Sequence, residues 1–479
     1  MRRMTLIMMA LAMVLGFTQC KKEQIVPQNE NQTEGVRITL SVDGGNNNSR
    51  VIVDPTGHTD PDYATVTFED GDVIYVGNNG AYCGYLEYKG STSKFEGSVE
   101  PTSTADYLHF YFMGNKGAKS QPSSVSITDQ TSKYPVISYA HSKTLYSGAG
   151  AYSAKLQNYC AIVKFTTTNI DADITITGMK NTVAVNFGAN NAADGTGVGN
   201  NPYTPSKTGD GEITLHRVSN TERWAILLPQ SQVTTAMAFA SGYATKSAFT
   251  VPEVTANMYH NTGVAVNLVA GYFFQVSASK VVQFSSGNLQ YKSGTGWRFA
   301  PNQYDYIGAW NTSNYVDLFG WGTWGNSKNP LQTSGSYTWS TDFQGSLGGH
   351  NDWYTLSSSE WDYLFNHNTY GQATVNSKHG VILLPLGSSL SINTNHSSWS
   401  DNTINAATWT STYEAAGAVF LPAAGDRDGT TMEEVGVTGY YWSSSNYEGW
   451  GAYGADFNGS SKEVRDFIRG YGFSVRLVR

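Results

Sequence analysis

Hydrophobic and polar residues alternate along residues 36–42, Val-Arg-Ile-Thr-Leu-Ser-Val, which is the period-two pattern of a strand with one buried face. Further short apolar runs follow, and turns rich in Gly, Asn and Ser separate them. These runs lie at residues 65–68, 73–76, 108–112, 161–165, 174–176, 183–187, 224–229 and 264–268. Short strands joined by such turns predict β-sandwiches. Residues 65–68 and 73–76, with the turn Glu69-Asp70-Gly71-Asp72 between them, predict a strand-turn-strand unit.

From Tyr272 onward the residue types change, and aromatic residues become frequent. Residues 273–278, 281–291 and 297–300 predict strands that Gly/Ser turns separate. The aromatic-glycine loop at residues 318–325 is expected to insert into a core. This part of the chain therefore predicts a second kind of β-rich unit.

One helix is well marked in the same part. Ser357 can cap its N-terminus together with Glu360 three residues on, and Leu356 can pack against Trp361. Its apolar face consists of Trp361, Leu364 and Phe365. We expect this helix to belong to the scaffold.

Composition supports separate units. The 479 residues predict roughly two to four domains. Of the twelve Trp residues only Trp224 precedes residue 272, whereas all three Cys residues precede residue 161. Charged residues make up 14%, well below the roughly 25% of an average soluble domain, which favours strands and polar loops. The net charge of −8 and the lack of a dense Lys/Arg cluster exclude nucleic acid as an expected partner.

The N-terminus predicts export. Residues 1–4 carry two Arg residues, and the apolar run at 5–17 is too short to span a bilayer stably. Cys20 follows, so residues 1–20 are similar to a bacterial lipoprotein signal with Cys20 as the lipidated residue. The segment 15–20 lacks the small residue usually found just before such a Cys, which leaves a plain secretory signal as the alternative. The polar residues 21–34 predict a flexible tether.

Cys83 and Cys160 remain as a possible pair if Cys20 is acylated. An oxidising compartment permits a disulfide between them. Both residues lie in strand-like contexts, so two buried free thiols are the alternative.

The first part of the chain resembles the fimbrillins of Bacteroidales. The matching pieces, in order, are residues 36–42, 68–76, 161–165, 174–179 and 227–229. The resemblance implies a lipoprotein precursor with two β-sandwich lobes, placed at residues 35–167 and 168–269. It also implies assembly with other pilin subunits by donor-strand exchange, after an Arg-specific protease removes the first strand. Arg50 follows an Asn/Ser loop where such a cut would release residues 36–42, and an ordinary loop Arg is the alternative.

Residues 272–479 closely resemble the Bacteroidales paralogous domain with a C-type lectin-like fold, which is related to formylglycine-generating enzymes and to the variable proteins of diversity-generating retroelements. The matching pieces are residues 284–291, 317–322, 356–364, 380–385, 417–425, 441–445 and 472–476. Together the two resemblances imply a mainly β protein, in which a two-lobed fimbrillin-like β-sandwich region precedes an α+β C-type lectin-like domain.

In those variable proteins the residues between the two hydrophobic end segments form a binding face. Carried onto this chain, the resemblance implies that face for Asn446, Tyr447, Glu448, Trp450, Tyr453, Lys462, Arg465, Asp466 and Arg469. Tyr, Trp and Arg are also the residue types that dominate binding energy at interfaces. The alternative is a loop that only covers the core, with Trp450 and Phe467 buried.

Catalytic and metal-binding patterns are missing from the sequence. The related oxygenases need cysteines in this fold, and none follows Cys160. The nine His residues are widely spaced, which gives no zinc or iron motif. Trp399-Ser400-Asp401 is only faintly similar to a lectin calcium motif, and Asp426-Arg427-Asp428-Gly429 reads as a charged turn with an internal ion pair rather than a calcium loop. We expect no enzyme activity, cofactor or metal.

The expected function is that of a pilus tip adhesin at the cell surface, anchored in the outer membrane as a lipidated precursor. Its expected partners are other pilin subunits and a host or bacterial surface ligand, either a glycan or a protein. The tip position follows from the fused C-terminal domain, which leaves no free end to donate as a strand. The alternatives are a non-adhesive accessory pilin and an enzyme of the formylglycine-generating fold.

Overall fold

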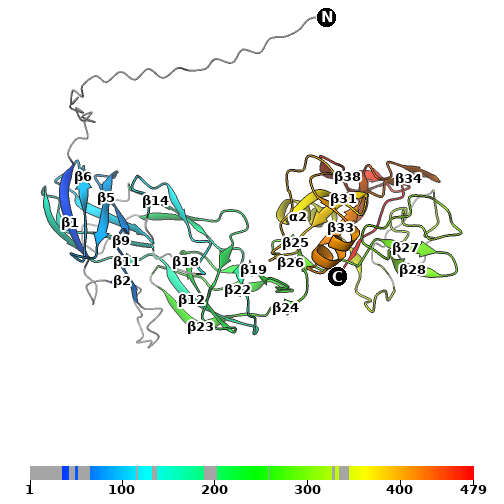
Figure 1. Ribbon diagram of the computed structural model, residues 1–479. Helices are drawn as coiled ribbons and strands as arrows, with labels where there is room; N and C mark the ends of the chain where they lie inside the picture. Colours follow the sequence, from blue (N-terminus) through cyan, green and yellow to red (C-terminus); the bar gives the residue numbers. More distant parts are fainter. Residues whose placement is uncertain are drawn as a thin grey trace, which may run out of the picture.

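The computed structural model describes residues 35–42, 49–51, 65–114, 117–131, 137–187, 202–256, 258–325, 329–333, 343 and 345–479. The expected signal peptide, Cys20 and the tether lie outside these residues. The described chain is mainly β, as predicted, and its three parts follow one another in a row (Figure 1). Within the described residues, no helix is long and apolar enough to cross a membrane.

An eight-stranded sheet forms the first part, with the strand order β10-β1-β6-β5-β4-β7-β9-β11. Its strands are β1 (Val36–Val42), β4 (Val73–Asn78), β5 (Ala81–Lys89), β6 (Lys94–Val99), β7 (Tyr107–Met113), β9 (Ile137–Leu145), β10 (Gly150–Ala154) and β11 (Gln157–Asn158). β1 confirms the predicted first strand. It pairs with β6 in antiparallel and with β10 in parallel orientation, and its Ile38 and Leu40 are fully buried. Both edges of β1 are therefore paired.

The central strands of this sheet are buried on both faces. In β4, Ile74 lies in the core of the first part, whereas Tyr75 lies in a second core that the next part of the chain supplies. In β7, Phe112 and Tyr111 divide in the same way. A strand that is covered on both sides reads as a continuous apolar run, which explains the missing alternation in β4 and β7.

The predicted strand-turn-strand unit forms two strands that pair elsewhere. β3 (Thr65–Thr67) pairs with β2 (Ser49–Val51), whereas β4 pairs with β5 and β7. The prediction that the two strands form one unit is therefore wrong, because longer-range pairing prevails over the local turn. Arg50 lies in β2 opposite Val66, so it occupies a short strand rather than a loop.

The second part consists of several small sheets around one core. The sheets have the orders β17-β18-β12-β23, β16-β13-β20-β21-β24, β15-β14-β8 and β19-β22. The strands are β8 (Ser124–Ser126), β12 (Ala161–Thr167), β13 (Thr175–Ile176), β14 (Thr182–Val185), β15 (Tyr203–Ser206), β16 (Ile213–Thr214), β17 (His216–Arg217), β18 (Glu222–Leu227), β19 (Val233–Ala236), β20 (Ala238–Ala240), β21 (Tyr243–Ala244), β22 (Phe249–Val251), β23 (Tyr259–Val266) and β24 (Val269–Ala270). A boundary at residue 168 assigns β12 to the first lobe, yet β12 pairs with β18 and β23 of the second part.

The C-terminal part begins with two hairpins, β25 (Phe274–Ser277) with β26 (Lys280–Val282) and β27 (Leu289–Lys292) with β28 (Gly296–Phe299). The sheets β32-β30-β31-β33 and β36-β37-β38 follow, with the pairs β34-β35 and β29-β39. Their strands are β29 (Tyr354–Thr355), β30 (Tyr370–Val375), β31 (Lys378–Leu383), β32 (Thr403–Ile404), β33 (Val419–Pro422), β34 (Asp426–Asp428), β35 (Thr431–Glu433), β36 (Gly439–Asn446), β37 (Gly451–Phe457), β38 (Lys462–Ile468) and β39 (Leu477–Val478). A short helix α3 (Ala406–Thr408) continues into a π-helix, η1 (Trp409–Glu414).

The predicted helix is confirmed as α2 (Ser358–His367). Ser357 is its N-cap and forms a capping box with Glu360, which satisfies two backbone N–H groups at the helix start. The predicted apolar face of α2 is buried against β25 and the sheet β36-β37-β38. The aromatic-glycine loop is also buried, as expected, with Trp321 and Trp324 in the core.

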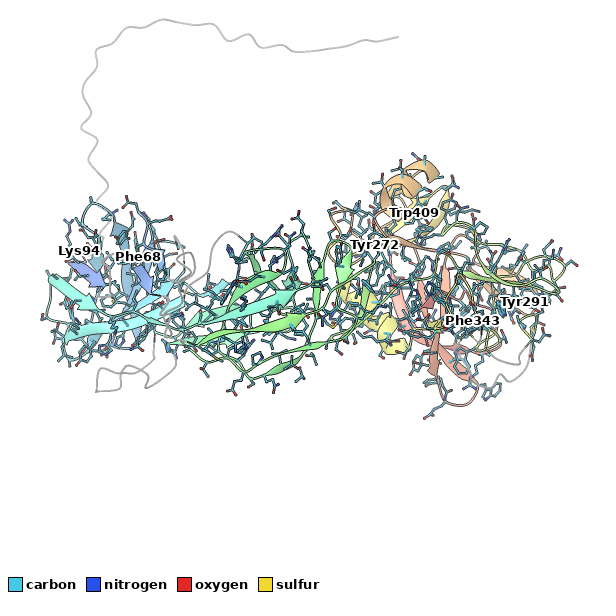
Figure 2. All side chains as sticks on the ribbon, turned by 90° about the horizontal axis from the view of Figure 1, so that it is seen from below. Phe68, Lys94, Tyr272, Tyr291, Phe343 and Trp409 are labelled. Atoms are coloured by element: carbon cyan, nitrogen blue, oxygen red, sulfur yellow. The ribbon has the colours of Figure 1, made fainter. Side chains whose placement is uncertain are left out.

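The second and C-terminal parts pack directly against each other. Phe273 and Val281 share a small apolar cluster with Met237 of the second part. Tyr272, labelled at this junction in Figure 2, donates a hydrogen bond from its hydroxyl to the carbonyl of Ala415 at 2.9 Å. Its ring lies against Gly417, where an added Cβ would stand 1.9 Å from the ring and φ is +83°. Only glycine fits this position.

Candidate functional site

The two hydrophobic end segments of the C-terminal sequence form a buried scaffold. Trp442 and Phe473 stack with ring centroids 4.3 Å apart. The indole N–H of Trp442 donates to the carbonyl of Phe319 at 2.6 Å, and that of Trp321 donates to the carbonyl of Ser443 at 2.7 Å. Because these large rings are buried and their polar atoms are satisfied, the strands between them start from a rigid base.

The segment between them forms the antiparallel sheet β36-β37-β38. β37 and β38 pair without a bulge from Gly451 opposite Ile468 to Phe457 opposite Lys462. Directly opposed residues share a face of the sheet, and successive residues alternate between faces. The register therefore decides on which side each candidate residue lies.

The nine candidate residues do not share one face. Tyr453 and Asp466 are directly opposed and lie on one side of the sheet. Arg465 lies on the other side, where it forms an ion pair with Asp456 at 3.0 Å and its guanidinium lies 4.6 Å from the ring centroid of Phe467. The expectation of a single binding face for all nine is corrected accordingly, because the two-residue period of β38 separates Arg465 from Asp466.

Lys462 and Arg465 both serve contacts within the protein. Lys462 donates to the side-chain oxygen of Asn366 on α2, and burial lowers the pKa of its ammonium group. Burial also raises the pKa of Asp456, although Arg465 lies beside it. The hydrogen bond to Asp456 in turn raises the pKa of Arg465. These residues fix β38 against its surroundings.

Arg469 holds the turn between β36 and β37. Its Nε donates to the carbonyl of Gly451 at 2.7 Å, and its Nη2 donates to the side chain of Asn446 and to the carbonyl of Tyr447. The guanidinium lies 4.9 Å from the ring centroid of Trp321 in the buried loop. Arg469 and Asn446 thus position the turn.

The remaining candidates form an aromatic and acidic region, in which Tyr453 is half-buried and the others are exposed, and which we call the tip surface. It consists of Tyr447, Glu448, Trp450, Tyr453, Asp466 and Ile468. Trp450 is 80% exposed, which excludes the alternative in which it fills the core, whereas Phe467 is half-buried. The rings of Tyr447 and Tyr453 meet edge to face at 5.4 Å.

Ile468 was missing from the candidates predicted from the sequence. It is 53% exposed and lies on the same side of the sheet as Tyr453 and Asp466. A period-two reading of β38 from Asp466 would have found it. An exposed cluster of large side chains on a rigid scaffold is the arrangement that typifies binding hot spots.

The weak calcium-like motifs have internal roles. The carboxylate of Asp401 accepts hydrogen bonds from the backbone N–H groups of Ser397 and Ser398, and the former lowers its pKa. Arg427 is buried, and its guanidinium lies 4.2 Å from the ring centroid of Trp310, so the charged turn is anchored by an aromatic contact. In the described part of the chain, no three His, Cys, Asp or Glu residues are grouped to hold a metal ion.

Cys83 and Cys160 are buried free thiols. Burial raises the pKa of each thiol to about 12, so neither forms a reactive thiolate at neutral pH. The alternative of two free thiols is therefore the one that the structure contains.

Asp317 is expected to make the stability of the C-terminal part depend on pH. It is 2% exposed, its carboxylate accepts the backbone N–H of Ile307 at 2.7 Å, and burial raises its pKa to about 6. The unfolded chain should release this proton near its ordinary pKa of about 3.9. Between these values the folded state binds more protons than the unfolded state. The contribution of Asp317 to the free energy of unfolding should therefore fall by about 1.4 kcal/mol per pH unit as the pH rises, and remain level above pH 6.

Asp317→Asn should remove this loss. The free energy of unfolding of the variant, minus that of the parent protein, is expected to rise by roughly 2–3 kcal/mol between pH 4 and pH 7. Urea unfolding at several pH values measures this difference. A difference that stays constant over the range would contradict the assignment.

No protein-family model and no curated protein matches the chain. Among solved structures, a candidate cell adhesion protein from Bacteroides uniformis is 12% identical, with 52% of this chain and 98% of that protein covered and a TM-score of 0.30. A fimbrial protein from Bacteroides ovatus is 11% identical, with 93% and 99% covered and a TM-score of 0.25. The fimbrial anchor protein Mfa2 from Porphyromonas gingivalis is 10% identical, with 44% and 77% covered and a TM-score of 0.20. At these TM-scores the similarities carry no argument, so the functional reading depends on the residues of this chain.

Proposed function

We propose that the protein is a fimbrial adhesin of the cell surface, which joins a pilus through its N-terminal β-sandwiches and binds an extracellular ligand through the tip surface. The observation that carries the proposal is the 80% exposure of Trp450 on a turn that Arg469 holds in place. A large exposed indole on a rigid turn loses little conformational entropy on binding. Residues that bind a partner in this way should lie at the surface of the assembly.

The arrangement of β1 supports assembly by strand exchange. β1 fills a gap between β6 and β10 and contributes Ile38 and Leu40 to the core. Its removal would expose two strand edges and two apolar sites, which an extended segment of another subunit could fill. The segment between β1 and β2 lies outside the described residues, and cleavage at Arg50 remains part of the proposal.

The connection between the second and C-terminal parts supports a position at the pilus tip. β24 leads into β25 through only Gly271, Tyr272 and Phe273, and β39 is buried and paired with β29. Neither segment is free to complete another subunit. Immunogold labelling of purified pili should place the protein at their ends, and an even distribution along the shaft would overturn this placement.

Binding screens with the full chain can identify the class of ligand. Screening on glycan and protein arrays should give a specific ligand whose binding is retained in the presence of the pilus. Complete lack of binding, together with incorporation into pili, would favour the accessory pilin that the sequence also allows. Turnover of a substrate would favour an enzyme instead.

A further inference from the structure

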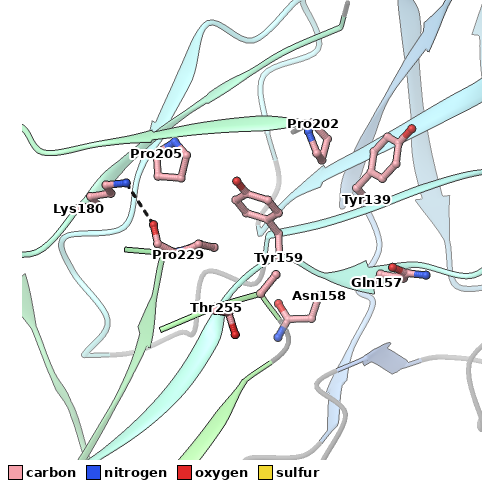
Figure 3. A pocket seen from close by; sticks show the side chains of 10 residues that line it. Tyr139, Gln157, Asn158, Tyr159, Lys180, Pro202, Pro205, Pro229 and Thr255 are labelled. Atoms are coloured by element: carbon pink, nitrogen blue, oxygen red, sulfur yellow. Dashed lines mark hydrogen bonds between the residues drawn. The ribbon is translucent and has the colours of Figure 1, made fainter. Parts of the chain in front are cut away.

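A cavity of about 330 Å³ lies where the first and second parts of the chain meet (Figure 3). Tyr139 and Gln157 line it from the first sheet, Tyr159 lines it from the connection to the second part, and Lys180 and Pro205 line it from the second part itself. Its volume lies within the roughly 300–1,000 Å³ range of small-molecule sites. The cavity is separate from the tip surface.

The walls of this cavity are flat rings held in fixed positions. Figure 3 shows Tyr159 in the middle of the lining residues, with Pro202 and Pro205 on one side of it. The hydroxyl of Tyr159 donates to the carbonyl of Tyr203 at 3.1 Å, and the hydroxyl of Tyr139 lies 2.6 Å from Nδ1 of the buried His109. Because both phenol rings are fixed before a ligand arrives, little ordering is required on binding.

Among the described residues that line the cavity, Lys180 is the only charged one, and none of them carries a carboxylate. Its ammonium group donates to the carbonyl of Pro229 at 3.3 Å, which uses one of its three N–H donors. The backbone N–H of Lys180 donates to the side chain of Gln230 at 2.7 Å, so the residue is anchored. A positive site in a protein of net charge −8 selects an anionic group from solution.

We propose that this cavity binds a sugar ring that carries a carboxylate, such as a uronic or sialic acid residue. The apolar face of the ring lies against Tyr159 and the prolines, the carboxylate pairs with Lys180, and the ring hydroxyls hydrogen-bond to the side chains of Gln157 and Thr255. Apolar walls with a few placed polar groups are the usual composition of such sites. A charge-assisted hydrogen bond then distinguishes acidic from neutral sugars.

Isothermal titration of the full chain with methyl glucuronide and methyl glucoside tests the proposal, because these probes share a ring and differ in the carboxylate. The glucuronide should bind at least about tenfold more tightly, with an affinity that falls as salt increases. Methyl sialoside, titrated in parallel, shows which acidic sugar fits better. Equal binding of the glucuronide and the glucoside would overturn the proposal, as would the absence of acidic-sugar binding at millimolar concentration.

Variants locate the binding. Lys180→Met keeps the aliphatic stem and should reduce the preference for the glucuronide to less than about threefold, whereas Lys180→Arg should retain it. Trp450→Ala should leave it unchanged, because Trp450 belongs to the tip surface. Loss of glucuronide binding in Trp450→Ala, with retention in Lys180→Met, would overturn the assignment to this cavity. Thermal unfolding of each variant verifies that it is folded.

Discussion

A chain that begins at Val51, and therefore lacks β1, is expected to unfold at a clearly lower temperature than the full chain, and a peptide of residues 36–42 is expected to restore most of the difference. β1 buries Ile38 and Leu40 completely. Burial of two such side chains contributes about 3–6 kcal/mol. The backbone groups that β6 and β10 direct toward β1 also lose their partners.

The matched control is the same peptide with Ile38→Asp and Leu40→Asp. It retains the backbone donors and acceptors but would bury two carboxylates, so it should not restore the unfolding temperature. Scanning calorimetry of the truncated chain with each peptide makes the comparison. Equal effects of the two peptides would contradict the expectation that burial of Ile38 and Leu40 stabilises β1 in the sheet.

Arg476→Ala is expected to destabilise the C-terminal part by about 3–5 kcal/mol. Arg476 is fully buried, and its guanidinium donates to the side chains of Gln303, at 2.7 Å, and Asn288 and to the carbonyl of Phe420. Burial lowers its pKa to about 10. Truncation would remove the guanidinium donor from all three acceptors inside a core and would leave a cavity.

Two further variants separate the effect of the cavity from the effect of losing a guanidinium. Arg476→Met fills much of the space without the charge and should be less damaging than Arg476→Ala. Arg465→Ala removes a guanidinium at the surface and should change stability by about 1 kcal/mol or less. Tryptophan fluorescence during urea unfolding reports on this part of the chain, because eleven of the twelve Trp residues follow residue 272. Equal midpoints for Arg476→Ala and Arg465→Ala would contradict the role of the buried network.

Local patterns in the sequence predicted the elements whose signal is local. The alternation at residues 36–42 gave β1, and the capping box at Ser357 and Glu360 gave α2. Strand pairing was harder to predict from the sequence, because it depends on residues far apart in the chain. β3 pairs with β2 instead of β4, and β12 pairs across to β18 and β23, for reasons that no local turn encodes.

In the candidate site, too, features with a local sequence signal were predictable, whereas features that depend on strand pairing were not. The buried rings of Trp442 and Phe473 and the exposure of Trp450 agree with the residue types in the sequence. The separation of Arg465 from Asp466, however, depends on the register between β37 and β38. The structural role of Arg469 was not predictable either, because its contacts are to Trp321 and to backbone carbonyls in the turn.

The most direct test of the adhesin proposal compares two variants of the full chain for binding to the ligand that the arrays identify. Trp450→Ala alters the tip surface, whereas Glu463→Ala changes an exposed residue of β38 on the opposite side of the sheet. Truncation of a binding hot spot removes at least about 2 kcal/mol, which corresponds to roughly thirtyfold weaker binding. The account predicts such a loss for Trp450→Ala and unchanged affinity for Glu463→Ala, and equal affinities of the two variants would contradict it.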